Sequence, residues 1–285
     1  MEYLMTYGWA ILVIAVVLGV LFQLGVFSTA SFAPKAKAGQ CQVQVVGSGS
    51  STTHQLAGLC SPELPQYVAT FQTSSYIDVS SLQSKLTGSL TVTGWVYFTD
   101  AYGTPCRTFI DNWQGASTYG FESMLYGCAG LYVGNSLGSP SAIGWSTGVV
   151  PTDKWVFLAV TYNETTGALQ SLVGGDTLST QSGRPGSLTS PSPIPFYIGA
   201  QPGSSSVISF NGYISNIQLY NNSLTSAELN GAYQEGIGGA PVAPQYIVGW
   251  WPLNGNFNDY SGNNNNGQSS GVGFTGSWTN GYSAP

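Results

Sequence analysis

The segment 155–162, which reads WVFLAVTY, gives the clearest indication of the fold of this chain. It is almost entirely apolar, as expected for a central β-strand that is buried on both faces. Residues 89–98 (SLTVTGWVYF) alternate instead, with aliphatic and Phe side chains on one side of the strand and Thr, Trp and Tyr on the other. Residues 196–199 and 212–220 add two strand-like segments, and Gly, Ser, Thr and Asn are abundant between them. This pattern predicts a β-sandwich.

The composition limits the kinds of protein that this chain can be. Only 6% of the residues are charged, whereas roughly 25% is typical of globular proteins. Disorder is excluded because 42% of the residues are apolar and 13% aromatic, which is ample for a core. The net charge is −6 with 6 Lys and Arg residues, so the basic surface that nucleic acid requires is absent. We therefore expect no nucleic-acid partner.

Short motifs along residues 68–233 resemble the laminin-G-like, concanavalin-A-like jelly roll in their order and spacing. The motifs are residues 69–71 with 75–79, 90–96, 154–162, 172–175, 197–200, and 210–214 followed by 219–224. The resemblance implies two packed antiparallel sheets, with a last strand and a short helix that close one side. Thr225 and Glu228 have capping-box spacing, which predicts that this helix begins there and continues through Ala232.

The end of the chain carries motifs that normally come first in such a domain. Residues 249–255 (GWWPLNG) and 258–263 (NDYSGN) resemble the opening strand and loop of the jelly roll, yet here they follow it. We therefore predict a circular permutation, in which residues 246–285 fold back onto a single head formed by residues 41–285. Residues 234–244 would join the two parts. The alternative is a truncated second domain, but so short a segment cannot bury an adequate core alone.

The first 27 residues differ in kind from the rest of the chain. They read MEYLMTYGWAILVIAVVLGVLFQLGVF, and their apolar side chains would surround a helix rather than form one stripe. A helix over residues 3–26 would be about 36 Å long, enough to cross a bilayer core of about 30 Å. The predicted fold class is thus mostly β, with a long N-terminal hydrophobic α-helix before the antiparallel sandwich. Residues 28–40 read as the linker.

The run MEYLMTYGWAILVI resembles the mature N-terminus of archaeal type IV pilin-like proteins, in which a near-terminal Glu begins a long apolar helix. The resemblance implies a helical homopolymer, membrane insertion before assembly, and a prepilin peptidase and pilus assembly machinery as partners. The residues expected in assembly are Glu2, Tyr3, Trp9, Ile11, Ile14, Val17, Leu18, Leu21 and Phe22. An ordinary membrane anchor and a cleaved signal peptide are the alternatives. The apolar run exceeds the usual ~7–15 residues of a signal peptide, and no basic region precedes it.

Cysteines and sequons indicate a cell-surface, extracellular head. The 4 cysteines are Cys41, Cys60, Cys106 and Cys128, an even number that suggests disulfides. Sequential pairing is the simplest of the possible connectivities. The sequons at Asn163 and Asn221 are expected glycosylation sites.

No set of residues in the sequence indicates an enzyme. The only histidine, His54, lies in a Ser- and Thr-rich segment, and serine lacks a nucleophile-elbow context. Asp100, Asp111 and Glu122 are candidate carboxylates, but loops separate them and no motif links them. We expect no catalysis. A glycan-degrading enzyme that uses Asp111 or Glu122 remains an alternative.

Sugar binding and calcium binding are possible for this fold. Aromatic rings that could stack on pyranose faces are Trp113, Tyr119, Tyr132 and Trp145. Asp259 matches the region that supplies a calcium ligand in relatives of this jelly roll. The acidic pair often found before the last strand is replaced here by Ser215 and Asn216, which weakens the expectation of calcium. We expect no other cofactor.

One prediction of function uses both halves of the chain. It is a structural subunit of an extracellular archaeal type IV pilus-like filament, which polymerises through its N-terminal helix and carries the sandwich on the surface for adhesion. The alternative is a membrane-anchored, monomeric, lectin-like protein that binds surface glycans. Both depend on a head that folds as a β-sandwich.

Overall fold

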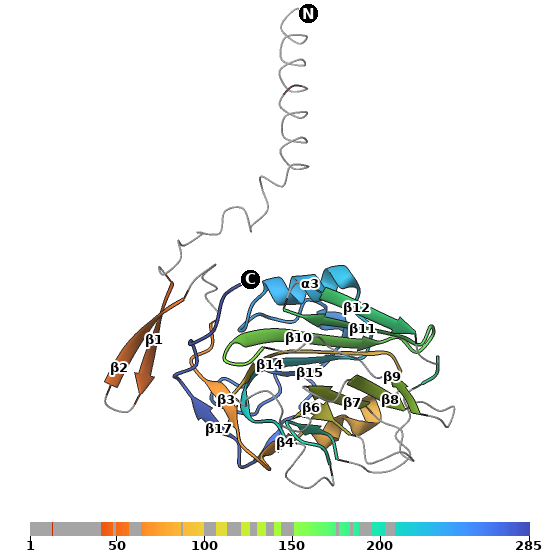
Figure 1. The fold of residues 1–285 in the computed structure, drawn as a ribbon, viewed down its shortest axis with the longest axis horizontal. Helices are drawn as coiled ribbons and strands as arrows, with labels where there is room; N and C mark the ends of the chain where they lie inside the picture. Colours follow the sequence, from red (N-terminus) through yellow and green to blue (C-terminus); the bar gives the residue numbers. More distant parts are fainter. Residues whose placement is uncertain are drawn as a thin grey trace, which may run out of the picture. The chain divides into compact units, whose positions relative to one another are not determined.

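The head of the protein is a β-sandwich, shown by a computed structural model (Figure 1). The structure describes Val13 and residues 41–47, 50–56, 64–86, 88–99, 107–112, 121–125, 130–134, 140–143, 151–174, 177–182, 185–187, 195–202 and 209–285. The chain divides into two compact units, residues 1–36 and residues 37–285. The described residues other than Val13 all belong to the second unit.

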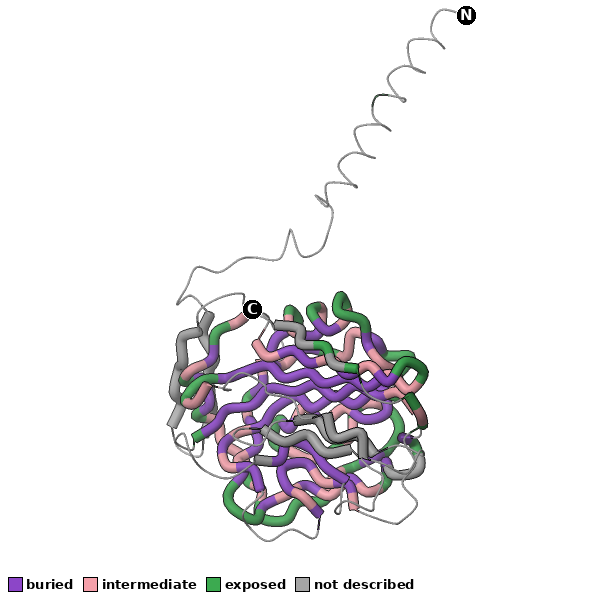
Figure 2. The backbone as a smooth tube through the Cα atoms, turned by 45° about the vertical axis from the view of Figure 1, so that its right-hand side comes forward, coloured by how far each residue is buried: buried purple, intermediate pink, exposed green. Residues whose placement is uncertain are grey.

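The larger sheet has eight strands and holds the segments that the sequence marks most clearly. Its order is β12-β11-β10-β5-β14-β3-β17, and β15 also pairs with β14. These strands are β3 (Val68–Phe71), β5 (Leu90–Phe98), β10 (Trp155–Tyr162), β11 (Ala168–Val173), β12 (Thr177–Ser182), β14 (Gly212–Tyr220), β15 (Ile247–Trp251) and β17 (Gly273–Thr275). Every residue of β10 is buried, which confirms the predicted central strand, and Figure 2 shows how buried residues follow these strands.

The second sheet has seven strands in the order β16-β4-β13-β6-β7-β8-β9. They are β4 (Tyr76–Asp78), β6 (Arg107–Asp111), β7 (Phe121–Leu125), β8 (Gly130–Gly134), β9 (Pro140–Ile143), β13 (Tyr197–Ile198) and β16 (Gln268–Ser270). Strands β1 (Cys41–Gly47) and β2 (Ser50–Leu56) pair with each other in a separate hairpin. The short helices are η1 (Ser80–Lys85), α3 (Ser226–Gln234) and η3 (Pro244–Tyr246).

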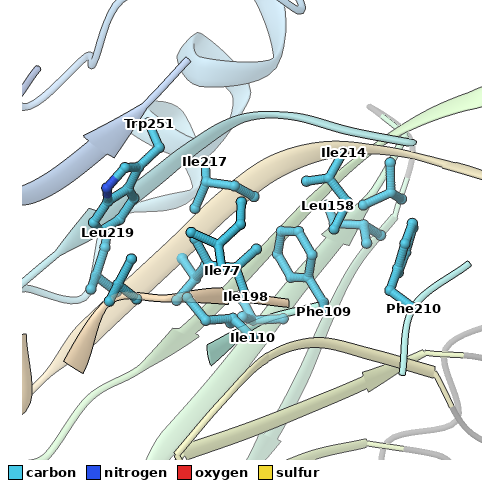
Figure 3. Close-up of a cluster of buried hydrophobic side chains, with 14 of the residues drawn as sticks. Ile77, Phe109, Ile110, Leu158, Ile198, Phe210, Ile214, Ile217, Leu219 and Trp251 are labelled. Carbon is cyan, nitrogen blue, oxygen red and sulfur yellow. The ribbon is translucent and has the colours of Figure 1, made fainter. Parts of the chain in front are cut away.

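The core lies between the two sheets (Figure 3). From the seven-stranded sheet, Ile77, Ile110 and Ile198 are fully buried in it. From the eight-stranded sheet, Ile217 and Trp251 are fully buried in the same cluster. Burying each large apolar side chain contributes roughly 1.5–3 kcal/mol, so this contact is the main source of stability for the head.

Residues after 246 complete both sheets. Strand β15 pairs with β14, and β17 pairs with β3, in the eight-stranded sheet. Strand β16 lies between them in sequence but pairs with β4 in the seven-stranded sheet. The indole N–H of Trp251 donates to the carbonyl of Asn265 at 3.0 Å, which fixes the loop before β16 to the core.

The outer face of the eight-stranded sheet is covered by α3 and by the last residues of the chain. Helix α3 begins with the predicted capping box, in which Glu228 N–H donates to Thr225 Oγ1 and Thr225 N–H donates to Glu228 Oε2. Tyr233 of α3 stacks on Trp95 with ring centroids 5.9 Å apart. Trp278 packs edge-on against Trp155, whose indole N–H donates to the Trp278 carbonyl at 2.7 Å.

The predicted fold class is wrong in its long N-terminal helix. The antiparallel sandwich is found, but the α-helix described in it, Ser226–Gln234, has only nine residues. A search of the described residues reveals no apolar helix of membrane-spanning length. The predicted helix, residues 1–27, lies outside the described residues except for Val13. Hydropathy indicates that an apolar segment must be buried, but it does not identify the neighbours that would cover a helix with apolar side chains on all sides.

We expect Trp278→Ala to destabilise the full-length chain by about 3–5 kcal/mol. Trp278 is 1% exposed, and its indole N–H donates to the carbonyl of Pro65 at 3.0 Å, so the change opens a cavity and leaves that carbonyl unpaired. Urea unfolding followed by tryptophan fluorescence measures the loss. The matched control is Tyr260→Ala, because Tyr260 is 53% exposed and its removal should cost under about 1 kcal/mol. Equal losses for the two variants would contradict the prediction.

Candidate functional site

Two tyrosines stack on the outer face of the seven-stranded sheet. The rings of Tyr76 on β4 and Tyr197 on β13 lie with centroids 4.2 Å apart and planes inclined by 20°. The pairing register places Tyr197 opposite Asp78 and Ile198 opposite Ile77. Because side chains alternate along a strand and both isoleucines are buried in the core, Tyr76, Asp78 and Tyr197 point away from it. All three are partly exposed, and we call them the tyrosine cluster.

The start of η1 fixes the carboxylate of the cluster. Asp78 Oδ1 accepts hydrogen bonds from the Ser80 N–H, at 2.9 Å, and from the Ser80 hydroxyl. The same Ser80 oxygen accepts the Phe196 N–H at 3.1 Å, and the Val79 N–H donates to the Phe196 carbonyl at 2.8 Å. These bonds tie the segment before β13 to the end of β4. The cluster is therefore held in one arrangement by backbone contacts on both sides.

The Tyr197 hydroxyl is a neutral donor near neutral pH. Burial raises the pKa of Tyr197 to about 12, and the Tyr76 and Asp78 side chains beside it add to the rise. A side-chain hydrogen bond with Tyr76 acts in the same direction. The cluster thus offers aromatic surface, a neutral Tyr197 hydroxyl and a carboxylate within one small area.

Beyond the tyrosine cluster, polar residues occupy consecutive positions across the seven-stranded sheet. Tyr197 lies opposite Asp111 of β6, Asp111 opposite Glu122 of β7, and Glu122 opposite Tyr132 of β8. On the other side, Gln268 of β16 lies opposite Asp78. The structure therefore brings Asp111, Glu122 and Tyr132, which loops separate in the sequence, to consecutive register positions. The side chain of Asp111 is fully buried.

Sequence reasoning missed the tyrosine cluster itself. The signal was present in the triplet Tyr-Ile-Asp at residues 76–78 and in Tyr-Ile at 197–198. In each, an isoleucine assigned to the core would direct its neighbours outward. Strands of three and two residues are too short for such a pattern to stand out.

Most of the other predicted site residues lie outside the described residues. These are the nine assembly residues, Cys60, Cys106, Cys128, Asp100, Trp113, Tyr119 and Trp145. Cys41 is the first residue of β1, and His54 lies in β2. The disulfides, the assembly role and the three sugar-stacking roles on undescribed residues stay predictions.

Asp259 organises the loop that follows β15. Its carboxylate accepts three backbone N–H groups, from Trp250 at 2.9 Å, Ser261 at 2.8 Å and Asn265 at 2.8 Å. These bonds occupy lone pairs that a calcium ion would use. Among the described residues, no group of three or more His, Cys, Asp or Glu side chains could hold a metal ion. Calcium binding by Asp259 stays a prediction, whereas its role in shaping the loop follows from these bonds.

The two sequons lie at the same end of the eight-stranded sheet. Asn163 follows β10 and Asn221 follows β14, and both strands pair with the start of β5 through Tyr162 and Tyr220. Asn163 Oδ1 accepts the N–H groups of Thr165 and Thr166 at 3.0 and 3.1 Å, and Asn221 is exposed. Asn163 directly precedes a turn and Asn221 lies at a bend, and their glycosylation stays a prediction.

Comparison with known proteins identifies the fold. The Laminin_G_3 family model, described as the concanavalin A-like lectin/glucanases superfamily, matches residues 71–230, which confirms the jelly-roll resemblance. This match begins well after the pilin-like residues 1–14 and so does not show that resemblance. A search of curated proteins finds no match.

Among solved structures, a Bacteroides ovatus protein with a proposed role in carbohydrate binding is 17% identical, with a TM-score of 0.55 over 81% of this chain. The present chain covers 64% of that protein, which is less than two thirds of its length. The CBM40 module of a Ruminococcus gnavus sialidase, bound to α2,3-sialyllactose, is 14% identical, with a TM-score of 0.45 over 59% of this chain and 98% of the module. Domain 4 of a Geobacillus stearothermophilus arabinanase, in complex with arabinotriose, is 16% identical, with a TM-score of 0.40 over 72% and 90%.

We expect Asp259→Ala to destabilise the full-length chain by about 1–3 kcal/mol, because three N–H groups lose their acceptor. Thermal unfolding measures the loss, and Asp153→Asn is the control, since the side chain of Asp153 is exposed and Asn tolerates its left-handed backbone at φ 59°. A variant as stable as the parent would show that water replaces the carboxylate. Added CaCl2 should leave the wild-type midpoint unchanged if the carboxylate serves only the loop.

Stability should fall as the pH rises from about 10 to about 12. Burial raises the pKa of Tyr197 and of Tyr282 to about 12, while an unfolded tyrosine ionises near 10. In this window the native state retains more protons than the unfolded state, so deprotonation favours unfolding; below about pH 10 these groups have no effect. Urea midpoints at pH 9, 10 and 11 test this. Tyr282→Phe should flatten the decline, and a midpoint that rises with pH would contradict the prediction.

Proposed function

This chain belongs to the concanavalin A-like lectin/glucanases superfamily, and we propose that its head binds carbohydrate through the tyrosine cluster on the seven-stranded sheet. The observation that carries the proposal is the stacked pair of Tyr76 and Tyr197 beside the fixed carboxylate of Asp78. Aromatic surface combined with a few well-placed polar groups is the usual composition of a small-ligand site.

The chemistry of the cluster suits a sugar. A pyranose presents C–H groups on its face and hydroxyls around its rim. The two rings stack on each other, so a sugar would stack on the outer face of one of them, while its hydroxyls would bond to Asp78 and to the tyrosine oxygens. Asp78 is already oriented by Ser80, so little side-chain entropy is lost on binding.

The position of the cluster also favours this face over the opposite one. Helix α3, Trp278 and Tyr282 cover the outer face of the eight-stranded sheet, and both aromatic residues are buried there. The cluster and the exposed strand β16 beside it have no such cover among the described residues. The Bacteroides ovatus protein of similar fold has a proposed role in carbohydrate binding, which agrees with the kind of ligand proposed here.

We propose binding without catalysis. Asp111 and Glu122 lie opposite each other in the strand register. Such proximity is required of two carboxylates that act together in glycoside hydrolysis. The Asp111 side chain, however, is fully buried and so cannot touch a glycan from the surface. Hydrolysis of the bound glycan, lost in Asp111→Asn, would overturn this part of the proposal.

Lectin-like binding replaces the filament subunit as the leading function. The filament prediction, with its self-assembly, peptidase and membrane partners, depends on residues 1–27, which lie outside the described residues except for Val13. The family match and the tyrosine cluster favour the binding function instead. A cell-surface location remains part of the proposal, supported by four cysteines and two sequons in the sequence.

Replacing Tyr197 with alanine should weaken glycan binding about tenfold or more, through loss of the stacking surface. The measurement is a glycan array with the full-length chain, followed by calorimetric titration of the best ligand. Tyr260→Ala is the matched control, because Tyr260 is an exposed tyrosine on the loop after β15. Circular dichroism should show that both variants fold. Unchanged affinity in Tyr197→Ala would place the site elsewhere, and an array without any bound glycan would refute the function.

A further inference from the structure

We infer that the ligand of the tyrosine cluster is an uncharged glycan, and that the face discriminates against sialylated, uronic-acid and sulfated sugars. This inference rests on the proposed function and specifies the ligand class of the same site. It follows from the charges placed around the cluster rather than from its aromatic rings.

The charged groups around the cluster are acidic. Asp78 lies directly opposite Tyr197 in the register. On the other side of Tyr197 the register continues with Asp111 and then Glu122. A glycan on Tyr197 would therefore meet the partly exposed carboxylate of Asp78, whereas the fully buried Asp111 would not touch it. The Asp78 carboxylate accepts hydrogen bonds from hydroxyl donors and repels an anionic ligand.

In the part of the seven-stranded sheet that the structure describes, basic residues are scarce. Among the described strands of the seven-stranded sheet, the one basic residue is Arg107, at the opposite end of β6 from Asp111. Four residues of a strand separate the two positions by about 13 Å. In the sequence, residues 108–153 and 185–285 contain no Lys or Arg, and Arg184, in the loop between β12 and β13, lies outside the described residues.

Lys85, in η1 after the cluster, is already engaged elsewhere. Its ammonium donates to Asn265 Oδ1 at 2.7 Å and to the Asn263 carbonyl at 3.3 Å, in the loop before β16. Among the described residues, a sugar carboxylate on the cluster would thus meet Asp78 without a cation that is free to bind it directly. Recognition of an anionic sugar ordinarily uses Arg or Lys in direct contact with the acid group. A neutral sugar instead supplies the hydroxyl donors that the Asp78 carboxylate accepts.

The test is a glycan array that carries each oligosaccharide as a matched pair, neutral and with one sialic or glucuronic acid added, probed with the full-length chain. We expect the neutral member to bind at least about tenfold more tightly at low salt. The reason is the repulsion between the Asp78 carboxylate and the acid group of the sugar, at a separation of about 4 Å and an effective dielectric constant near 20. The difference should shrink as salt is added, because salt screens partly exposed charges.

Two variants test whether the tyrosine cluster causes the discrimination between neutral and acidic glycans. Asp78→Asn removes the charge and keeps the shape, so the ratio of neutral to acidic binding should fall at least about threefold, even though neutral binding also weakens. Asp153→Asn is the matched control, because it removes an exposed carboxylate from the turn before β10 and should leave the ratio unchanged.

The outcomes separate this inference from the proposed function. Acidic glycans that bind as tightly as their neutral partners would overturn the inference while leaving carbohydrate binding intact. An unchanged ratio in Asp78→Asn would overturn the role given to the cluster. If neither member of any pair binds, the proposed function is refuted and this inference falls with it.

Discussion

The apolar contact between the two sheets is the interaction on which the rest of this structure depends. Ile77 and Ile198 are fully buried in it, together with Ile217 and Trp251 from the opposite sheet. Because a strand alternates its side chains, burying the two isoleucines directs Tyr76, Asp78 and Tyr197 outward. A slip of one residue in β4 or β13 would exchange core and surface. The candidate site is therefore a consequence of core packing, not an addition to it.

The sequence alone predicted the parts of this fold that carry a strong local pattern. The apolar run of β10 and the capping box of α3 are both found as expected. The long helix was wrong as a fold-class prediction, because hydropathy reports the need for burial but not the surroundings that provide it. The tyrosine cluster was missed for a different reason. It joins strands of three and two residues that lie far apart in the chain, and only the long-range register brings them together.

Hydrogen bonds between neutral polar groups connect segments of this chain that ion pairs would connect in more highly charged proteins. Asn216 lies at the centre of one such network, where its amide donates to the Gly239 carbonyl and its oxygen accepts the Trp250 indole N–H, both at 2.8 Å. Gln218 joins the same carbonyl at 3.0 Å. The network connects β14, β15 and the segment after α3. It suits a chain with only 6% charged residues, and such contacts depend little on salt.

The late strands also determine when the sandwich can form. Residues that meet in the finished head are widely separated in the chain: the Tyr67 N–H donates to Asn254 Oδ1, and the Trp278 indole donates to the Pro65 carbonyl. During synthesis, β3 and β4 must wait for β17 and β16, so their edges stay open until residues 268–275 have emerged. Such non-local pairing makes folding slow. The nascent head would thus be exposed to edge-to-edge association until its last strands arrive.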